Sequence, residues 1–478
     1  YITDGHRIKN SLQFPEPFKD FALRDGKSIL VYVSKSSIYK GGFDKEFSDF
    51  IQRLENVSDK KAVETINKIE HIWGANKTDH KSVMIDLLRK GVVIHHGSVP
   101  LEVRFLIEDF IRSGYASLCF ATSTLAQGIN MPFDIVWLIN NRQLGETEEE
   151  RALNFKNLVG RSGRLSKNEK FDYGYVYTSD PISFSQRLNT TYELSLVSIL
   201  DRPDIEDEDT KELVSSIKND TFDDNRNLPL SKVERLSQEP VLLSAKNFLD
   251  LIYKSGEDIK EGIGGKDNQI AREWAKNYLK EIYAASIARN LEPGENNVFD
   301  EAISIFFLMA QGYSFKEIAG IRYNRVTNRD NPGKTEASFL QPANTLPDKS
   351  AKNRYSIYPE NTPSTKVSYD RIVFDTYDYM DQVISFSLSD TFIAAFKIYE
   401  EKTGDERAEQ VIELFRYGTN NPKHILLMRY GFPAEMVHEV ADYVERVDES
   451  EIVFKSSLDS APIAIREMAE WYLPSISE

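Results

Sequence analysis

Segment 157–164 reads Asn-Leu-Val-Gly-Arg-Ser-Gly-Arg and places two arginines, Arg161 and Arg164, three residues apart. In a helix, residues at this spacing project from one face, and glycines beside them allow close backbone approach. Guanidinium groups are planar, permanently charged and well matched to phosphate oxygens. The spacing therefore predicts a phosphate clamp, although two arginines on one helical face are also typical of an ordinary solvated surface.

Short apolar runs alternate with amphipathic segments over the first part of the chain. The runs are typical of buried parallel strands, because their apolar residues are continuous and polar residues bound them. The predicted strands are 28–34, 92–94, 116–121, 134–139 and 174–177, and the predicted helices are about 43–54, 81–90 and 101–111. This alternation predicts an α/β fold, a doubly wound parallel sheet with helices on both faces.

Polar residues follow three of these predicted strands: Ser34, then His95 with His96, then Thr122 with Thr124. Ligands of such sheets bind beyond the carboxyl ends of the strands, so we expect these residues to share one rim. Their hydroxyl groups can meet a ligand, or can simply cap the helices that follow. The histidines have no second ligand pair at a useful spacing. We therefore expect no metal site, but a packed turn in which one imidazole reaches a backbone or phosphate oxygen.

Four segments in this region resemble, in the right order, motifs of superfamily 2 helicases. Segment 28–34 is similar to motif IV, segment 121–132 (Ala-Thr-Ser-Thr-Leu-Ala-Gln-Gly-Ile-Asn-Met-Pro) to motif V, and segment 157–164 to motif VI. Segment 91–100, followed by Arg104 and Glu108, resembles the one that precedes motif V in the Ski-like DExH branch. The resemblance covers about residues 1–185 and implies the second of two RecA-like lobes.

The resemblance also implies a role for each matched residue. Arg161 and Arg164 would be catalytic and act on the γ-phosphate of ATP. The residues near the bound nucleotide would be Gly128, Asn130, Asn157 and Gly160. The residues that contact single-stranded nucleic acid, either DNA or RNA, would be Ser34, His96, Thr122 and Thr124. These are expectations of a helicase that works with ATP and Mg²⁺.

A motor of this class also needs a P-loop and an acidic pair for Mg²⁺. The 478 residues contain neither G-x-x-x-x-G-K-[ST] nor an acidic box such as D-E-x-H. The sequence begins at Tyr1, so we expect a piece of a longer protein whose amino-terminal RecA-like lobe supplies these groups. The piece alone is expected to be inactive. Two alternatives stay open: a non-catalytic scaffold or regulatory module, and a nucleic-acid-binding adaptor without motor function.

Composition changes along the chain and predicts further domains. We expect a linker at 1–27, the RecA-like lobe at 28–185, an acidic linker at 186–240, a helical domain at 241–325, a basic polar loop at 326–367 and a C-terminal helical domain at 368–478. From Arg322 to Lys366, eight Lys or Arg face four Asp or Glu, with tyrosines interleaved. That segment suits single-strand binding, or simply a flexible loop. Near the end, Met436, Val440 and Val444 recur at helical spacing.

The net charge of −16 argues against a broadly basic surface, so any contact with nucleic acid must be local. No apolar run is long enough to span a membrane. The single cysteine, Cys119, fits a reducing compartment and, because it lies in an apolar run, a buried strand. We expect a cytoplasmic protein. Bacterial helicases with long helical extensions occur in antiviral defence, in repair and in RNA turnover, which makes defence one expectation for its role.

Overall fold

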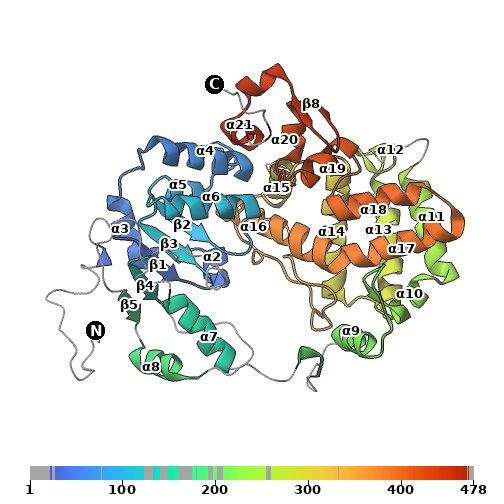
Figure 1. The fold of residues 1–478 in the computed structure, drawn as a ribbon, viewed down its shortest axis with the longest axis horizontal. Coiled ribbons are helices and arrows are strands. Elements are labelled where there is room, and N and C mark those ends of the chain that lie inside the picture. Colours follow the sequence, from blue (N-terminus) through green and yellow to red (C-terminus); the bar gives the residue numbers. More distant parts are fainter. Residues whose placement is uncertain are drawn as a thin grey trace. The chain divides into compact units, whose positions relative to one another are not determined.

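The computed structural model describes residues 22–23, 27–76, 78–122, 133–139, 148–160, 175–178, 180–191, 198–201, 208–253, 260–331, 333–470 and 472. The chain divides into two compact units, Tyr1–Ser195 and Leu196–Glu478, here called unit 1 and unit 2 (Figure 1). Unit 1 contains a five-stranded sheet, whereas unit 2 is mostly helical. This confirms the predicted class, an α/β lobe followed by helical domains.

The strands of unit 1 are all parallel and lie in the order β2-β3-β1-β4-β5. They are β1 Ile29–Tyr32, β2 Val92–His95, β3 Leu118–Ala121, β4 Ile135–Leu138 and β5 Tyr175–Thr178. The first four are buried at every position, as expected for a sheet covered on both faces. Each lies at a predicted strand. Cys119 is fully buried in β3, and burial raises the pKa of its thiol.

Helices cover both faces of the sheet. Phe120 and Trp137 share one face, because β1 pairs in register with both of their strands. The ring of Phe47 packs on both, with centroid distances of 5.8 and 5.3 Å. On the opposite face, His95 Nε2 lies 3.0 Å from Glu108 Oε1, which attaches α6 (Leu101–Arg112) to β2. This arrangement is the doubly wound one that the alternation predicts.

The remaining helices of unit 1 are mostly short. They are α2 Lys35–Lys40, η1 Lys45–Phe47, α3 Ser48–Arg53, α4 Lys60–Trp73, α5 Val83–Leu88, α7 Glu148–Val159 and α8 Pro181–Asn189. The predicted helix 43–54 is thus η1 followed by α3. Helix α4 is absent from the sequence-based prediction, although it buries Ala62, Ile66, Ile69 and Trp73 at helical spacing. It ends at Gly74, whose positive φ of 70° suits glycine.

Unit 2 is a bundle built around a long helical run. Its elements are α9 Glu208–Lys218, β6 Phe222–Asp223, β7 Leu228–Pro229, α10 Leu230–Leu236, α11 Glu239–Ile252, α12 Lys260–Ile263, α13 Gln269–Ser286, α14 Pro293–Ala310, α15 Phe315–Val326, α16 Tyr369–Asp378, the π-helix η5 Tyr379–Leu388, α17 Ser389–Thr403, α18 Arg407–Tyr417, α19 Pro422–Arg429, α20 Val437–Asp442, β8 Val444–Val447, β9 Ile452–Phe454 and α21 Ile463–Glu470, with short 3₁₀ turns η3 Ile199–Asp201, η4 Ser364–Lys366 and η6 Ser456–Ser460. Helices α16, η5 and α17 follow one another without a break. Stacked rings fill the core beside them: Phe415 lies 4.1 Å from Phe306 and 4.7 Å from Phe392.

Two parts of unit 2 can be compared with the sequence-based reading. The acidic segment, predicted as an exposed linker around one short helix, contains α9 and α10 in its residues 208–240, and carboxylates on α9 pair with cations of α10: Asp209 with Lys232, and Glu212 with Arg235. Near the end, Val444 does not continue a helix. It lies in β8, which pairs with β9 in an antiparallel hairpin.

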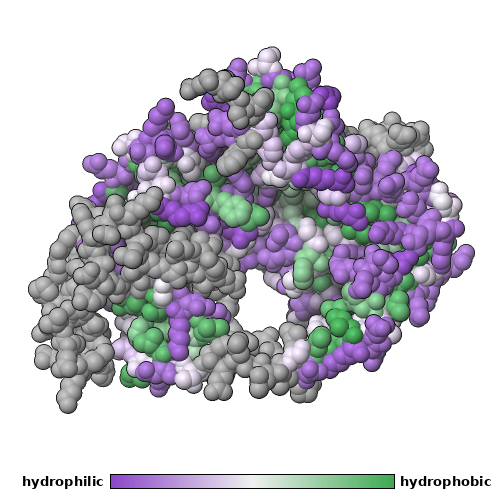
Figure 2. All heavy atoms as spheres, viewed as in Figure 1, coloured by the Kyte–Doolittle hydropathy of each residue, from purple (hydrophilic) through white to green (hydrophobic). Residues whose placement is uncertain are grey.

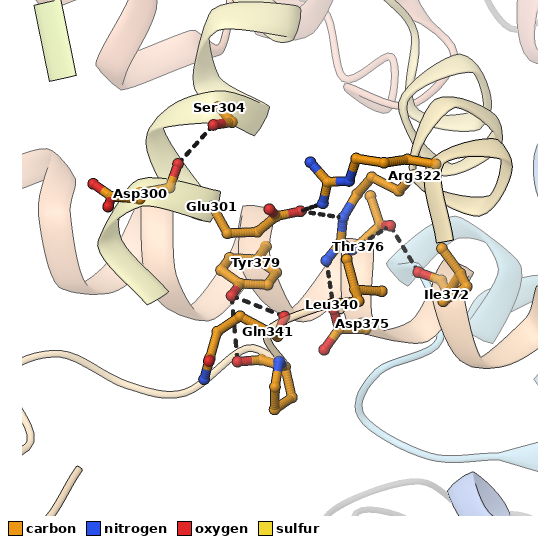
Figure 3. Close-up of polar contacts among 12 residues, drawn as sticks. Asp300, Glu301, Ser304, Arg322, Leu340, Gln341, Ile372, Asp375, Thr376 and Tyr379 are labelled. Carbon is orange, nitrogen blue, oxygen red and sulfur yellow. Dashed lines mark hydrogen bonds and ion pairs between the residues drawn. The ribbon is translucent and has the colours of Figure 1, made fainter. Parts of the chain in front are cut away.

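A buried arginine joins three elements of unit 2 (Figure 3). Arg322 on α15 is only 1% exposed. Its guanidinium donates to Glu301 of α14 at 2.9 Å, and to Asp375 and Thr376 of α16 at 2.7 Å each. The second carboxylate oxygen of Asp375 accepts from the backbone N–H of Ala343 at 2.8 Å. The carboxylate of Asp375 therefore anchors the basic polar segment to the bundle.

Hydrophilic residues cover much of the described surface of unit 2 on the face that Figure 2 shows, with smaller apolar patches among them. Among the helices that the structure describes, none combines the length and apolar character needed to cross a membrane.

Candidate nucleic-acid interface

The carboxyl ends of three adjacent strands form one rim of unit 1. The register pairs His95 of β2 with Ala121 of β3, and Ala121 with Tyr32 of β1. Backbone hydrogen bonds extend these pairs by one residue: Thr122 N donates to His95 O at 3.2 Å, and Val33 N donates to Ala121 O at 2.9 Å. The structure therefore brings the segments at Ser34, His96 and Thr122 together, as the strand pattern predicts.

Ser34 stands at the exposed end of β1 and begins α2. Its Oγ accepts a hydrogen bond from Ser37 N at 3.1 Å, so Ser34 is the N-cap of this helix. Capping uses the oxygen as an acceptor and leaves the hydroxyl hydrogen able to donate to an anion. Next to it, Lys35 is exposed and its Nζ lies 5.4 Å from the centroid of the Tyr39 ring. The end of β1 thus offers a hydroxyl and a cation to solvent.

His96 is fully buried in the turn after β2. Its Nδ1 accepts a hydrogen bond from Ser98 N at 3.1 Å, and its ring lies 6.0 Å from the ring of Tyr39. Burial lowers the pKa of His96 well below its usual range, and the nearby charges of Lys35, His95 and Arg104 lower it further. The imidazole is therefore neutral at physiological pH. The ring is packed in the turn, but its Nδ1 contacts a backbone N–H and not the backbone or phosphate oxygen that we expected, and the buried side chain presents no exposed surface to a strand.

Arg104 lies one turn into α6, close enough to His96 to depress its pKa. It is half-buried, and its Nε is buried without a hydrogen-bond partner in the described part of the chain. No side chain caps the start of α6, because its N-cap residue is Pro100. The start of a helix carries partial positive charge and unpaired N–H groups. Lys35, Arg104 and this helix end therefore bring positive charge to the rim, and Glu102 in the first turn of α6 adds a negative charge.

Thr122 follows β3 and is only 6% exposed. The segment that continues from it, with Thr124, Gly128 and Asn130, lies outside the described residues, and their roles stay predictions.

The arginine motif begins at the end of α7, which runs to Val159. Asn157 is exposed on the last turn of this helix, and Gly160 follows it in a turn, its N–H donating to Lys156 O at 2.8 Å. A Cβ atom on Gly160 would lie 3.1 Å from that same oxygen, which is a tight contact. Arg161 and Arg164 lie outside the described residues. The predicted roles of all four residues therefore stay predictions.

The residues predicted from the sequence to contact a strand do not include Lys35 and Arg104. Both lie beside segments that resemble helicase motifs, Lys35 directly after 28–34 and Arg104 after 91–100. A phosphate site needs positive charge as well as hydroxyl donors. The sequence signal for both residues is therefore a cation close to the end of a predicted strand. Together with Ser34 and the uncapped start of α6, they can bind the phosphates of a nucleic-acid backbone. Such contacts position a strand and do not read its sequence.

No family model matches the chain. Parts of it are similar to curated proteins. It is 34% identical over 109 residues to the Hachiman protein HamB of Bacillus cereus, which covers 20% of this chain and 10% of that protein. It is 28% identical over 161 residues to the ATP-dependent DNA helicase Hel308 of Pyrococcus abyssi, and 27% identical over 161 residues to Hel308 of Pyrococcus horikoshii.

Each Hel308 match covers 33% of this chain and 22% of the helicase. The matched stretch is thus about a fifth or less of the length of these curated relatives. Over part of its length the chain is homologous to Hel308 helicases, and this homology supports a place in the helicase superfamily.

Proposed function

We propose that this chain is the C-terminal part of an ATP-dependent nucleic-acid helicase or translocase of superfamily 2, in the Ski-like branch. Unit 1 would be its second RecA-like lobe, and unit 2 its accessory helical region. The observation that carries the proposal is the rim of unit 1. Motif-like segments that are far apart in sequence meet there at the ends of β1, β2 and β3, in a chain that is partly homologous to helicases.

In this proposal the rim holds the backbone of a single strand. Ser34 and Lys35 donate to phosphates from the end of β1, and Arg104 acts from α6. The neutral, buried His96 keeps the turn before α6 in place and adds no charge of its own. Thr122 and Thr124 extend the same surface at the end of β3. Because few cations take part, binding should be modest in strength and depend on salt with a shallow slope.

ATP and Mg²⁺ would be held mainly by a P-loop lobe that these residues do not contain. In the described part of the chain, no group of three or more His, Cys, Asp or Glu residues is placed to hold a metal ion. The chain would contribute Gly128, Asn130, Asn157 and Gly160 near the nucleotide. Arg161 and Arg164 would donate to the γ-phosphate across the cleft. The glycine at 160 suits close approach, since a side chain there would already crowd the end of α7.

Strand binding tests the rim directly. The assay is fluorescence anisotropy of a labelled single-stranded oligonucleotide with the 478-residue chain, over a series of salt concentrations. Thr122→Ala and Ser34→Ala should each weaken binding for all sequences alike, and Lys35→Ala should also make the salt slope shallower by roughly 0.7. Thr65→Ala is the matched control, because Thr65 is a threonine on α4 whose hydroxyl bonds to Lys61 O.

Binding that does not depend on salt, or that none of the rim substitutions changes, would show the rim assignment to be wrong. Specific weakening by the rim variants, with Thr65→Ala unchanged, supports it.

A further inference from the structure

The basic polar segment of unit 2 is an ordered platform. Its two arms, 335–340 and 356–364, run alongside each other and are joined by backbone hydrogen bonds. These are Ala337 N to Thr362 O, Ile357 N to Leu340 O, and Ser364 N to Thr335 O, at 2.7 to 2.9 Å. Beneath them lies a small apolar cluster formed by Val326, Leu340, Ile357, Tyr358, Val367 and Ile372. A flexible loop would show neither feature.

Arginines of this segment lie over aromatic rings. The guanidinium carbon of Arg354 is 3.7 Å from the centroid of Phe339, and that of Arg371 is 4.7 Å from the centroid of Tyr358. Phe339 remains 38% exposed, and Tyr355, the neighbour of Arg354, is 49% exposed. Phe339, Arg354 and Tyr355, here called the stacking surface, thus combine a guanidinium plane that lies over one exposed ring with a second exposed ring on the next residue of the chain.

The segment that carries the stacking surface also carries exposed cations, together with the exposed carboxylates of Glu336 and Glu360. Arg354, Lys334, Lys352 and Lys366 are exposed, and none of them has a carboxylate partner in the described part of the chain. Some other exposed arginines of unit 2 are held by acids, as Arg446 is by Asp448 and Glu451. Arg354 and the three lysines belong to a segment, 322–366, in which eight Lys or Arg face four Asp or Glu, a local basic excess in a chain of net charge −16. The partner of this segment should be an anion.

We propose that the stacking surface of unit 2 binds single-stranded nucleic acid, at a site separate from the rim of unit 1. Bases would stack on Phe339 and Tyr355 and on the plane of Arg354, and phosphates would meet the surrounding cations. Exposed rings between cations match a strand whose bases and phosphates alternate, whereas a simple anion would need the cations alone. The choice of ligand rests on the proposed function, while the site itself rests on this geometry.

The platform is fixed to the bundle before any ligand binds. Asp375 accepts from Ala343 N and from buried Arg322, and the hydroxyl of Tyr379 donates to Gln341 O at 3.2 Å. Residues 341–343 directly follow the arm that carries Phe339, so this buried network sets the position of that arm. A site held in place in this way loses little conformational freedom on binding.

The test uses the full protein and a labelled oligo(dT) of about 20 nucleotides. Phe339→Ala and Tyr355→Ala should each weaken binding roughly 5- to 100-fold, the range expected for loss of one stacked base. Arg354→Ala should weaken it and reduce the salt slope by roughly 0.7. Arg354→Lys should restore that slope without restoring the affinity, because lysine keeps the charge and lacks the plane.

Two matched controls remove exposed residues of the same kinds from the same unit. Trp274→Ala deletes an exposed ring of α13, and Arg446→Ala deletes an arginine that is already paired. Neither should change binding. Poly-glutamate at equal charge should fail to displace the oligonucleotide, because it has no bases to stack. Displacement as effective as that by unlabelled oligo(dT) would mean that charge alone acts, and would overturn the proposal.

Ultraviolet cross-linking of oligo(dT) to the unsubstituted protein gives a readout that does not depend on the variants folding. Cross-linked peptides should come from 335–358. Their absence, with strand binding intact, overturns this site and leaves the proposed function standing. If the unsubstituted protein binds no strand at all, both proposals fail.

Discussion

Removal of the buried guanidinium at Arg322 should destabilise unit 2 by about 3–5 kcal/mol, the range for deleting one partner of a buried ion pair. The side chain is 1% exposed and its partner Asp375 is 3% exposed, so water cannot replace the lost contact. Glu301 would keep Arg325, whereas Asp375 would keep only the N–H of Ala343. Most of the cost of Arg322→Ala therefore comes from Asp375, whose pKa burial already raises and which must then stay buried without its cation or take up a proton.

Equilibrium urea unfolding, followed by circular dichroism at 222 nm, measures this cost. Hydrogen exchange of the amides of α16 locates it in unit 2. Arg325→Ala is the matched control, because this arginine also pairs with Glu301 but is 47% exposed, and it should cost at most about 1 kcal/mol. Adding Asp375→Asn to Arg322→Ala should recover part of the loss, since the unpaired charge is removed. Equal costs for Arg322→Ala and Arg325→Ala, both below about 1 kcal/mol, would refute the reasoning.

Two further predictions concern unit 1 and the chain as a whole. In the folded state the pKa of His96 lies well below the usual value of about 6.5, so below that pH the unfolded state binds a proton at His96 and the folded state does not. The stability of unit 1 should therefore fall as the pH drops below about 6.5. Hydrogen exchange of the amides of β2 and β3, measured over a range of pH, reports this loss of stability. His96→Asn, which keeps an acceptor for Ser98 N, should make stability depend less steeply on pH. An unchanged dependence would show that another group titrates. The purified 478-residue chain should show no ATP hydrolysis stimulated by nucleic acid, because its sequence has no P-loop. Turnover by the clean chain would contradict that prediction.

The sheet was predictable because its strands are continuous apolar runs, a pattern that depends on little besides local sequence. The meeting of Ser34, His96 and Thr122 then followed from the rule that parallel strands end at one edge. The exposure of these residues was not predictable. How deeply a side chain is buried depends on the other side chains that pack against it. For His96 one of these is Tyr39, whose ring lies beside the imidazole.

Unit 2 shows why composition misled. The acidic composition of 186–240 does not reveal that Lys232 and Arg235 lie against the carboxylates of Asp209 and Glu212 in space. The polar segment 326–367 likewise contains few apolar residues, yet Leu340, Ile357 and Tyr358 suffice for a cluster once backbone hydrogen bonds align its arms. Helix α4 was missed despite its apolar spacing, because lysines and glutamates dilute the stripe. Val444 fits helical spacing too, but pairing across a hairpin decided its conformation.

The central claim is that Arg161 and Arg164 of this chain complete an ATPase. It is tested most directly by measuring turnover and melting temperature on the same Arg161 and Arg164 variants of the full-length protein. Removal of an arginine that stabilises charge developing at the γ-phosphate should lower stimulated turnover by about 10³-fold or more. Nucleotide affinity and melting temperature should change little, and Arg161→Lys should fare scarcely better than Arg161→Ala, because a point charge cannot replace the planar fork. A lowered melting temperature with unchanged turnover per folded molecule would contradict the claim and make these arginines part of an ordinary helix surface.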